Sequence, residues 1–136
     1  PSNYVSIVNH KRLSSKFSTQ LAIHKKNTLI IDARSNPAYK GEISVARRFG
    51  HIPSALNIPF VNNLVMDSNF LTLKNIDELK QIYKHIPKTK KIIIYCKIGK
   101  VSSMNYFALR ELGYDVANYD ASWREWGNDD SLPIEK

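Results

Sequence analysis

Cysteine is the scarcest reactive group in this chain, since Cys96 is the only one among 136 residues. A lone cysteine cannot form an internal disulfide, so the fold does not depend on one, and the compartment stays open. Long hydrophobic runs are also missing: the run at residues 92–94 is far shorter than the roughly 20 residues that cross a bilayer. No leader segment is recognisable, and the chain begins with Pro1 rather than methionine. We therefore expect a processed product or an excised domain, with no membrane partner.

Acidic residues are few: the chain has 12 Asp and Glu and 20 Lys and Arg, which gives a net charge of +8. Residues 1–31 contain five bases and no acid. This balance suits anionic partners, although a simple basic surface would give the same composition. The bases are not interleaved with aromatic residues and no binding module is recognisable, so no nucleic acid partner is expected. The four histidines and one cysteine lack metal-ligand spacing, and we expect neither a metal nor a cofactor.

Two continuous apolar runs predict buried strands, "TLIIDA" at residues 28–33 and "KIIIYC" at residues 91–96. Runs without polar alternation are typical of strands covered on both faces in a parallel sheet. Shorter strands are predicted at residues 4–8, 56–58 and 115–120.

Apolar residues at helical spacing predict helices between these strands. One covers residues 75–86, with Asn75 as its N-cap and a stripe formed by Ile76, Leu79, Ile82, Tyr83 and Ile86. Another covers residues 102–112, ended by Gly113, with inward positions at Met104, Phe107, Ala108 and Leu112. An earlier helical face is predicted by Leu13, Phe17 and Leu21, and a short helix or turn by "ASWREWG".

Strands that alternate with helices imply an α/β fold, with a parallel sheet flanked by helices on both faces. In such sheets, ligands bind beyond the carboxyl ends of the strands. Cys96 lies at such an end, as do two polar pairs, Asp32 with Arg34 and Asp120 with Ser122.

The loop "CKIGKV" predicts an activated thiol at Cys96. Backbone N–H groups of a curled loop, the start of the following helix, and the charges of Lys97 and Lys100 all stabilise a thiolate. Gly99 allows the positive φ or close approach that a tight loop needs. The alternative is an inert buried cysteine, but the position, the glycine and the lysines favour a nucleophile with a lowered pKa that binds an anionic substrate.

Two other cysteine chemistries have sequence requirements of their own. A cysteine-dependent phosphatase requires the spacing C-x5-R for a bidentate guanidinium clamp, and Ser102 occupies the arginine position. A cysteine–histidine hydrolase would need a histidine within hydrogen-bond reach, and the sequence leaves that open for His10, His24, His51 and His85.

The chain resembles the rhodanese domain, most closely the catalytic C-terminal half of tandem thiosulfate and 3-mercaptopyruvate sulfurtransferases. Four blocks carry this resemblance in the family's order: "IIDARS", "GHIPSALNIPF", "YCKIGKVSS" and "LRELGYDVANYDASWREWGNDDSLPIE". It implies a single rhodanese-like domain over residues 1–136, with a five-stranded parallel sheet, preceded in the full-length protein by a second rhodanese domain. It also implies that Cys96 is catalytic and that the substrate is bound by Lys97, Ile98, Gly99, Lys100, Val101 and Ser102.

Several positions depart from the family pattern. Mercaptopyruvate-type loops read "CGSGVT" and thiosulfate-type loops "CRKGVT", so the two lysines of "CKIGKV" are more similar to the thiosulfate type. The family's substrate-binding arginines lack clear counterparts; Lys40, Arg47 or Arg48 could replace them, and Arg47 is the preferred candidate. Ser54 replaces the usual glycine of "GHIPG", a change that we expect to be tolerated.

The resemblance implies a sulfurtransferase. Cys96 would accept sulfur from a small anionic donor, thiosulfate or 3-mercaptopyruvate, as a persulfide and pass it to a thiol or protein acceptor. The alternative is a catalytically weak binding or regulatory module, suggested by Ile98 and Val101 at loop positions that are often polar. Structural rather than catalytic roles are expected for an Asp32–Arg34 pair, for His51 as a partner of backbone groups, and for Trp123 and Trp126 as packing residues.

Overall fold

The computed structural model describes residues 3, 5, 7, 9–67 and 70–136. Five strands form one sheet in the order β1-β7-β6-β2-β3, and every neighbouring pair is parallel. They are β1 (Leu13–Ser14), β2 (Thr28–Asp32), β3 (Leu56–Asn57), β6 (Lys91–Tyr95) and β7 (Asp115–Tyr119). The predicted α/β fold with a five-stranded parallel sheet is therefore confirmed. The strand expected at residues 4–8 falls on Tyr4, Ser6 and Val8, which lie outside the described residues.

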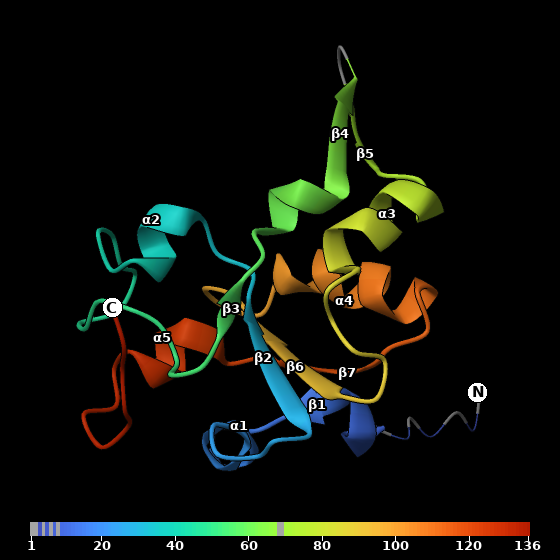
Figure 1. Ribbon diagram of the computed structural model, residues 1–136. Helices are drawn as coiled ribbons and strands as arrows, with labels where there is room; N and C mark the ends of the chain where they lie inside the picture. The colour runs from blue at the N-terminus through green and yellow to red at the C-terminus, as the bar shows by residue number, and fades with distance from the viewer. Residues whose placement is uncertain (1–2, 4, 6, 8, 68–69) are drawn as a thin grey trace.

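Helices cover both faces of the sheet, as Figure 1 shows, with α3 and α4 on one face and α1 and α5 on the other. The helices are α1 (Lys16–Ala22), α2 (Asn36–Tyr39), α3 (Ile76–Tyr83), α4 (Ser102–Glu111) and α5 (Ser122–Trp126). Two short 3-10 helices, η1 (His10–Arg12) and η2 (Phe60–Asn63), are also present. Across the described residues, no helix combines the length and the apolar character needed to span a bilayer.

The central strand β6 explains why its sequence is apolar without alternation. Ile92 and Ile94 pack into the core under α3 and α4, whereas Ile93 and Tyr95 pack into the core under α1 and α5. Each of the four is at most 4% exposed. Because successive side chains of a strand point to opposite faces, a strand covered on both sides needs an apolar residue at every position.

The predicted helices at residues 75–86 and 102–112 are present, but two inward assignments were wrong. Asn75 caps α3 as expected, accepting hydrogen bonds from the amides of Asp77 and Glu78, yet Ile76 is 43% exposed. In α4 the buried face runs through Ser102, Asn105, Ala108 and Leu109, and Phe107, which lies off this face, is 52% exposed. The α4 face is displaced because Asn105 points inward and donates to the carbonyl of Ile58 at 2.9 Å.

The face predicted by Leu13, Phe17 and Leu21 also needs correction. Leu13 belongs to β1 rather than to a helix, and Phe17 and Leu21 on α1 are exposed. Thr19 is buried instead, because its hydroxyl bonds the carbonyl of Ser15 at 2.8 Å and the hydroxyl of Ser14 at 3.0 Å. A satisfied polar side chain thus occupies a position that the apolar pattern did not indicate.

An antiparallel hairpin was not predicted from the sequence. It consists of β4 (Leu64–Asp67) and β5 (Phe70–Leu73), and it extends away from the body of the molecule (Figure 1). Two apolar residues of β5 are strongly exposed, Phe70 at 75% and Leu71 at 64%, whereas Leu73 packs against the core. The hairpin follows η2 and leads into α3, so it interrupts the crossover that connects β3 to β6.

Candidate active site

Cys96 is the first residue after β6, and the turn after β7 fixes its backbone. Its amide donates to the hydroxyl of Ser122 at 3.1 Å, and its carbonyl accepts from the amide of Trp123 at 3.1 Å. The next carbonyl, of Lys97, accepts from the amide of Arg124 at 2.9 Å. The carboxyl ends of β6 and β7 are therefore joined by backbone hydrogen bonds where the sequence predicted a ligand site.

Four hydrogen-bond donors surround the Cys96 sulfur, and we call them the hydrogen-bond ring. They are the hydroxyl of Ser102 and the backbone amides of Ser102, Ile98 and Val101. Burial raises the pKa of the Cys96 thiol, but these donors together outweigh it and hold the pKa below its ordinary value. The lowered pKa agrees in direction with the sequence expectation, but its main causes are these hydrogen bonds and not the charges of Lys97 and Lys100, which the expectation also invoked.

The hydroxyl of Ser102 is shared among several acceptors. It lies 3.0 Å from the carbonyl oxygen of Gly99 and 2.8 Å from Oδ1 of Asn118, in addition to the Cys96 sulfur. Because a hydroxyl has a single proton, the sulfur competes with two oxygens for it. The three backbone amides are therefore the more constant part of the ring.

Gly99 is required by the path of the loop. Its φ is +80°, in the left-handed region, and a Cβ there would lie 2.3 Å from the carbonyl oxygen of Asp120 and 2.5 Å from its Oδ1. An amino acid with a Cβ could not occupy position 99 without moving the loop away from Asp120. The packing of the loop against Asp120 is what turns its amides toward a common centre.

The Cys96 hollow is a depression of about 390 Å³ lined by Val45, Cys96, Lys97, Ile98, Lys100, Val101 and Arg124. Three of these residues are cationic and none is acidic. Across the described part of the chain, no carboxylate forms an ion pair with Lys97, Lys100 or Arg124. Cys96 is 0% exposed and is the one fully buried member of the lining, so its sulfur lies beneath the floor of the hollow. The site combines apolar walls, unpaired cations and a buried thiol.

The structure brings together six of the predicted substrate-binding positions but not Arg47. Lys97, Ile98, Lys100 and Val101 line the hollow, whereas Gly99 and Ser102 shape the loop around the sulfur. The guanidinium of Arg47 instead bonds the carbonyl of Asn128 at 2.9 Å and the carboxylate of Asp130 at 3.1 Å.

The other two cations proposed from the sequence are also placed elsewhere. Arg48 donates to the carbonyls of Trp126, at 2.9 Å, and Leu132, at 2.8 Å, and Lys40 does not line the hollow. The third cation is Arg124, which the sequence analysis missed. Its only sequence signal was its place close to Asp120 and Ser122 at a predicted strand end, and that signal does not show which strand ends lie beside Cys96.

The contacts expected for three structural roles are present. Arg34 and Asp32 form a buried ion pair with Nη2 and Oδ2 2.6 Å apart, and the guanidinium lies 4.3 Å from the ring centroid of Trp123. Nδ1 of His51 lies 2.9 Å from the carbonyl oxygen of Tyr39. Trp123 and Trp126 are both 0% exposed.

The histidine alternative gains no support from the geometry. Among the residues that the structure describes, no histidine lines the Cys96 hollow. His51 stacks on the ring of Tyr39 with the centroids 3.7 Å apart, and His10 lies on a different surface. The partners that the structure gives the sulfur are therefore hydrogen-bond donors of its own loop and not a histidine.

Comparison with known proteins gives a consistent result. The model of the rhodanese-like domain matches residues 18–129. A putative thiosulfate sulfurtransferase of Haloferax volcanii is 42% identical over 122 residues, which cover 82% of this chain and 42% of that protein. The sulfur carrier protein TtuD of Thermus thermophilus is 41% identical over 119 residues, which cover 79% of this chain and 41% of that protein. The chain thus spans about two fifths of the length of these relatives.

Solved structures with the same fold are more distant in sequence. The anaerobic ergothioneine biosynthesis enzyme from Chlorobium limicola has a TM-score of 0.78 at 23% identity, covering 93% of this chain and 32% of that one. The Tum1 protein from Saccharomyces cerevisiae has a TM-score of 0.73 at 24% identity, covering 86% of this chain and 43% of that one. At this level of identity the likeness concerns the fold.

Proposed function

Because this chain belongs to the rhodanese-like domain family, we propose that it is a sulfurtransferase with Cys96 as the catalytic nucleophile. The observation that carries the proposal is the buried Cys96 sulfur, held by the hydrogen-bond ring inside a hollow with three cations. Such a sulfur favours the thiolate, which is the nucleophilic form. The names of the relatives, a putative thiosulfate sulfurtransferase and a sulfur carrier protein, agree with this chemistry.

The proposed first step uses thiosulfate as the donor. The Cys96 thiolate attacks the outer sulfur of thiosulfate and forms a new S–S bond. The bond between the two sulfurs of thiosulfate breaks, and sulfite leaves with the electron pair. Cys96 becomes a persulfide whose terminal sulfur carries one negative charge. The amides of the ring stabilise this charge, as preorganised donors stabilise an oxyanion.

The cations favour thiosulfate over 3-mercaptopyruvate. Thiosulfate is a dianion and sulfite leaves as an anion, so Lys97, Lys100 and Arg124 neutralise charge both before and after the transfer. With 3-mercaptopyruvate, a monoanion, the thiol proton would also have to reach the carbon that loses sulfur, for pyruvate to form. We therefore propose thiosulfate as the better donor and 3-mercaptopyruvate as the poorer one.

In the second step a nucleophile attacks the outer sulfur of the persulfide and releases the Cys96 thiolate. Cyanide serves as the acceptor in an assay, and a small thiol or a protein thiol is the proposed acceptor in the cell. The exposed positions of Lys97 and Lys100 leave their ammonium groups available to an anionic acceptor.

We also propose that the chain is the C-terminal, catalytic half of a tandem protein whose N-terminal half is a second rhodanese domain. In support, it covers only about two fifths of its curated relatives. A gene that encodes these residues and no second domain would contradict this proposal.

A sulfur-transfer assay tests the proposed activity. Wild-type protein with thiosulfate and cyanide should form thiocyanate, and Cys96→Ser should form none because it lacks the attacking sulfur. Ser103→Ala is a suitable control, since this neighbouring hydroxyl bonds the carbonyl of Lys100 rather than the sulfur. Equal rates for wild type and Cys96→Ser, or no turnover with either donor, would contradict the proposed activity. The chain would then be a binding module, and the buried sulfur and the apolar side chains of Val45, Ile98 and Val101 would account for the lack of turnover.

A further inference from the structure

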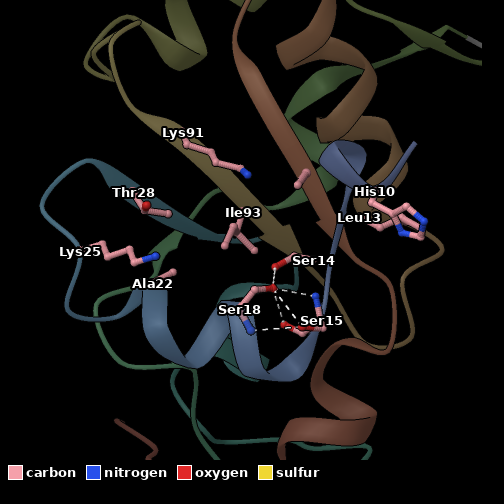
Figure 2. Close-up of a pocket in the computed structure, with 11 residues that line it drawn as sticks. His10, Leu13, Ser14, Ser15, Ser18, Ala22, Lys25, Thr28, Lys91 and Ile93 are labelled. Carbon is pink, nitrogen blue, oxygen red and sulfur yellow. Dashed lines mark hydrogen bonds between the residues drawn. The ribbon is translucent and has the colours of Figure 1, made fainter. Parts of the chain in front are cut away.

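A second hollow lies at the opposite end of β6 from Cys96. It has a volume of about 490 Å³ and lies between α1 and the starts of β2 and β6, whose first residues, Thr28 and Lys91, line it (Figure 2). We call it the lysine hollow and define it by Lys25, Lys91, Ser14, Ser18, Ile93 and Ala117. Its volume lies within the range of small-molecule sites, which is roughly 300–1,000 Å³. None of its lining residues belongs to the proposed sulfur-transfer site.

The charges around the lysine hollow are of one sign. The ammonium groups of Lys25 and Lys91 are directed into it from two sides (Figure 2), and no Asp or Glu lines it. Neither lysine forms an ion pair with a carboxylate in the described ranges. Asp115 lies beside Lys91 in the register of β6 and β7, but its carboxylate bonds Arg12 at 3.5 Å. The two unneutralised cations therefore attract an anion.

The remaining lining supplies hydroxyl groups and an apolar floor. The hydroxyls of Ser14 and Ser18 lie 2.8 Å apart, and because Ser18 donates to the carbonyl of Ser15 at 3.0 Å, Ser14 is the hydroxyl that can rotate to donate to a ligand oxygen. Ala22, Ile93 and Ala117 are all at most 4% exposed and form an apolar surface beside these polar groups. A ligand that fits this lining combines an anionic group with an apolar part.

We propose that the lysine hollow binds a phosphate monoester with a compact apolar body. A phosphate dianion would be neutralised by Lys25 and Lys91 together, and lysine binds phosphate well as a point charge. A carboxylate, with a single charge, would leave one ammonium group without a counter-charge. The apolar body would lie against Ile93 and Ala117, and a free inorganic ion would lack this contact. This proposal does not depend on sulfur transfer at Cys96.

Phenyl phosphate is the probe, and inorganic phosphate and phenol are its two halves. Titrations followed by NMR in the Cys96→Ser variant separate binding from any reaction at the sulfur. Phenyl phosphate should shift the signals of Ala22, Ile93 and Ala117 and bind about tenfold or more tightly than either half. Lys25→Gln with Lys91→Gln should weaken it by about tenfold. Lys26→Gln with Lys90→Gln removes the same charge outside the lining and should change it by less than about twofold.

Four outcomes would overturn the proposal. The first is the absence of shifts at millimolar phenyl phosphate, and the second is shifts confined to residues 96–101. The third is equal weakening by the two double variants, which would indicate attraction to the overall positive charge rather than to this hollow. The fourth is inorganic phosphate binding as tightly as phenyl phosphate, which would show that the apolar floor does not contribute. The NMR spectrum of each variant establishes that it is folded before binding is measured.

Discussion

Two serines occupy the left-handed backbone region that normally favours glycine. Ser54 has a φ of 66° and Ser122 a φ of 55°. This conformation costs a non-glycine residue on the order of 1 kcal/mol or more. At Ser122 the buried hydroxyl accepts from the Cys96 amide at 3.1 Å and donates to the carbonyl of Tyr119 at 2.8 Å, whereas Ser54 is exposed. The side chain therefore offsets the strain only at Ser122.

Glycine at these two positions should have opposite effects. Ser54→Gly relieves strain and should stabilise the fold by up to about 1 kcal/mol. Ser122→Gly relieves the same strain but leaves the Cys96 amide without its partner, a loss of about 1–3 kcal/mol that should outweigh the relief, so this variant should be less stable and slower in sulfur transfer. Denaturant unfolding of both variants provides the measurement. Stabilisation by both would show that the Ser122 hydroxyl contributes nothing to holding Cys96.

The hydrogen-bond ring predicts a pH dependence. Because the pKa of Cys96 is lowered, its thiolate persists as the pH falls below the ordinary cysteine pKa and is lost only when the pH passes the lower, folded-state value. Ser102→Ala removes one donor, so the midpoint of alkylation rate against pH should move to higher pH, whereas Ser103→Ala should not move it. An unchanged midpoint in Ser102→Ala would mean that the amides alone set the pKa.

At the scale of elements, the loop between β6 and α4 depends on its contact with the end of β7. Gly99 and Gly113 both have a φ of +80°, but their surroundings differ. A Cβ at Gly99 would meet the Asp120 backbone at 2.3 Å, whereas at Gly113 the nearest atom, Nζ of Lys88, is 3.8 Å away. A side chain at Gly113 would therefore cause backbone strain alone, whereas a side chain at Gly99 would cause the same strain and also disturb the packing of the loop.

Alanine at each glycine tests this dependence. Gly113→Ala should cost about 1–2 kcal/mol of stability from strain alone and leave sulfur transfer unchanged. Gly99→Ala should cost more, and should reduce kcat/KM by at least about tenfold, because the loop must move away from Asp120 and the ring loses its geometry. Thermal unfolding and thiocyanate formation are measured together. Full activity of Gly99→Ala would contradict the assigned role of the loop conformation.

Some elements could be predicted from local sequence patterns, and others could not. Residues 28–33 and 91–96 could be assigned because a strand buried on both faces requires an unbroken apolar run. The face of α1 could not, because Thr19 is buried through local hydroxyl bonds while Phe17 is left exposed. The orientation of α4 depends on the contact of Asn105 with the carbonyl of Ile58, 47 residues earlier in the chain, and no local pattern contains that contact.

At the scale of the whole molecule, three of the 20 Lys and Arg residues behind the net charge of +8 line the Cys96 hollow. Lys97, Lys100 and Arg124 surround the Cys96 hollow without a counter-charge, so the local field attracts an anionic donor. Cys96 and its loop could be predicted from the sequence because they are contiguous. Arg124 could not be chosen over Arg47, because only the packing of α5 against the loop brings it there.

Replacing Arg124 and Arg47 in turn tests which arginine binds the substrate: the structure favours Arg124, whereas the sequence analysis preferred Arg47. Arg124→Gln should raise KM for thiosulfate by about tenfold, the scale of one lost charge-assisted contact, and should weaken the salt dependence of kcat/KM. Arg47→Gln should leave both unchanged, because its guanidinium is bound to Asn128 and Asp130. Steady-state kinetics at two ionic strengths provide the comparison. A larger effect at Arg47 than at Arg124 would restore the assignment based on the resemblance.

The most direct measurement is the mass of the intact protein after incubation with thiosulfate and removal of the excess. Cys96 is the only cysteine, so a persulfide formed by this reaction can be assigned without ambiguity. The account predicts a gain of one sulfur atom, absent in Cys96→Ser and reversed by cyanide. An unchanged mass in the wild type, or the same gain in Cys96→Ser, would contradict it.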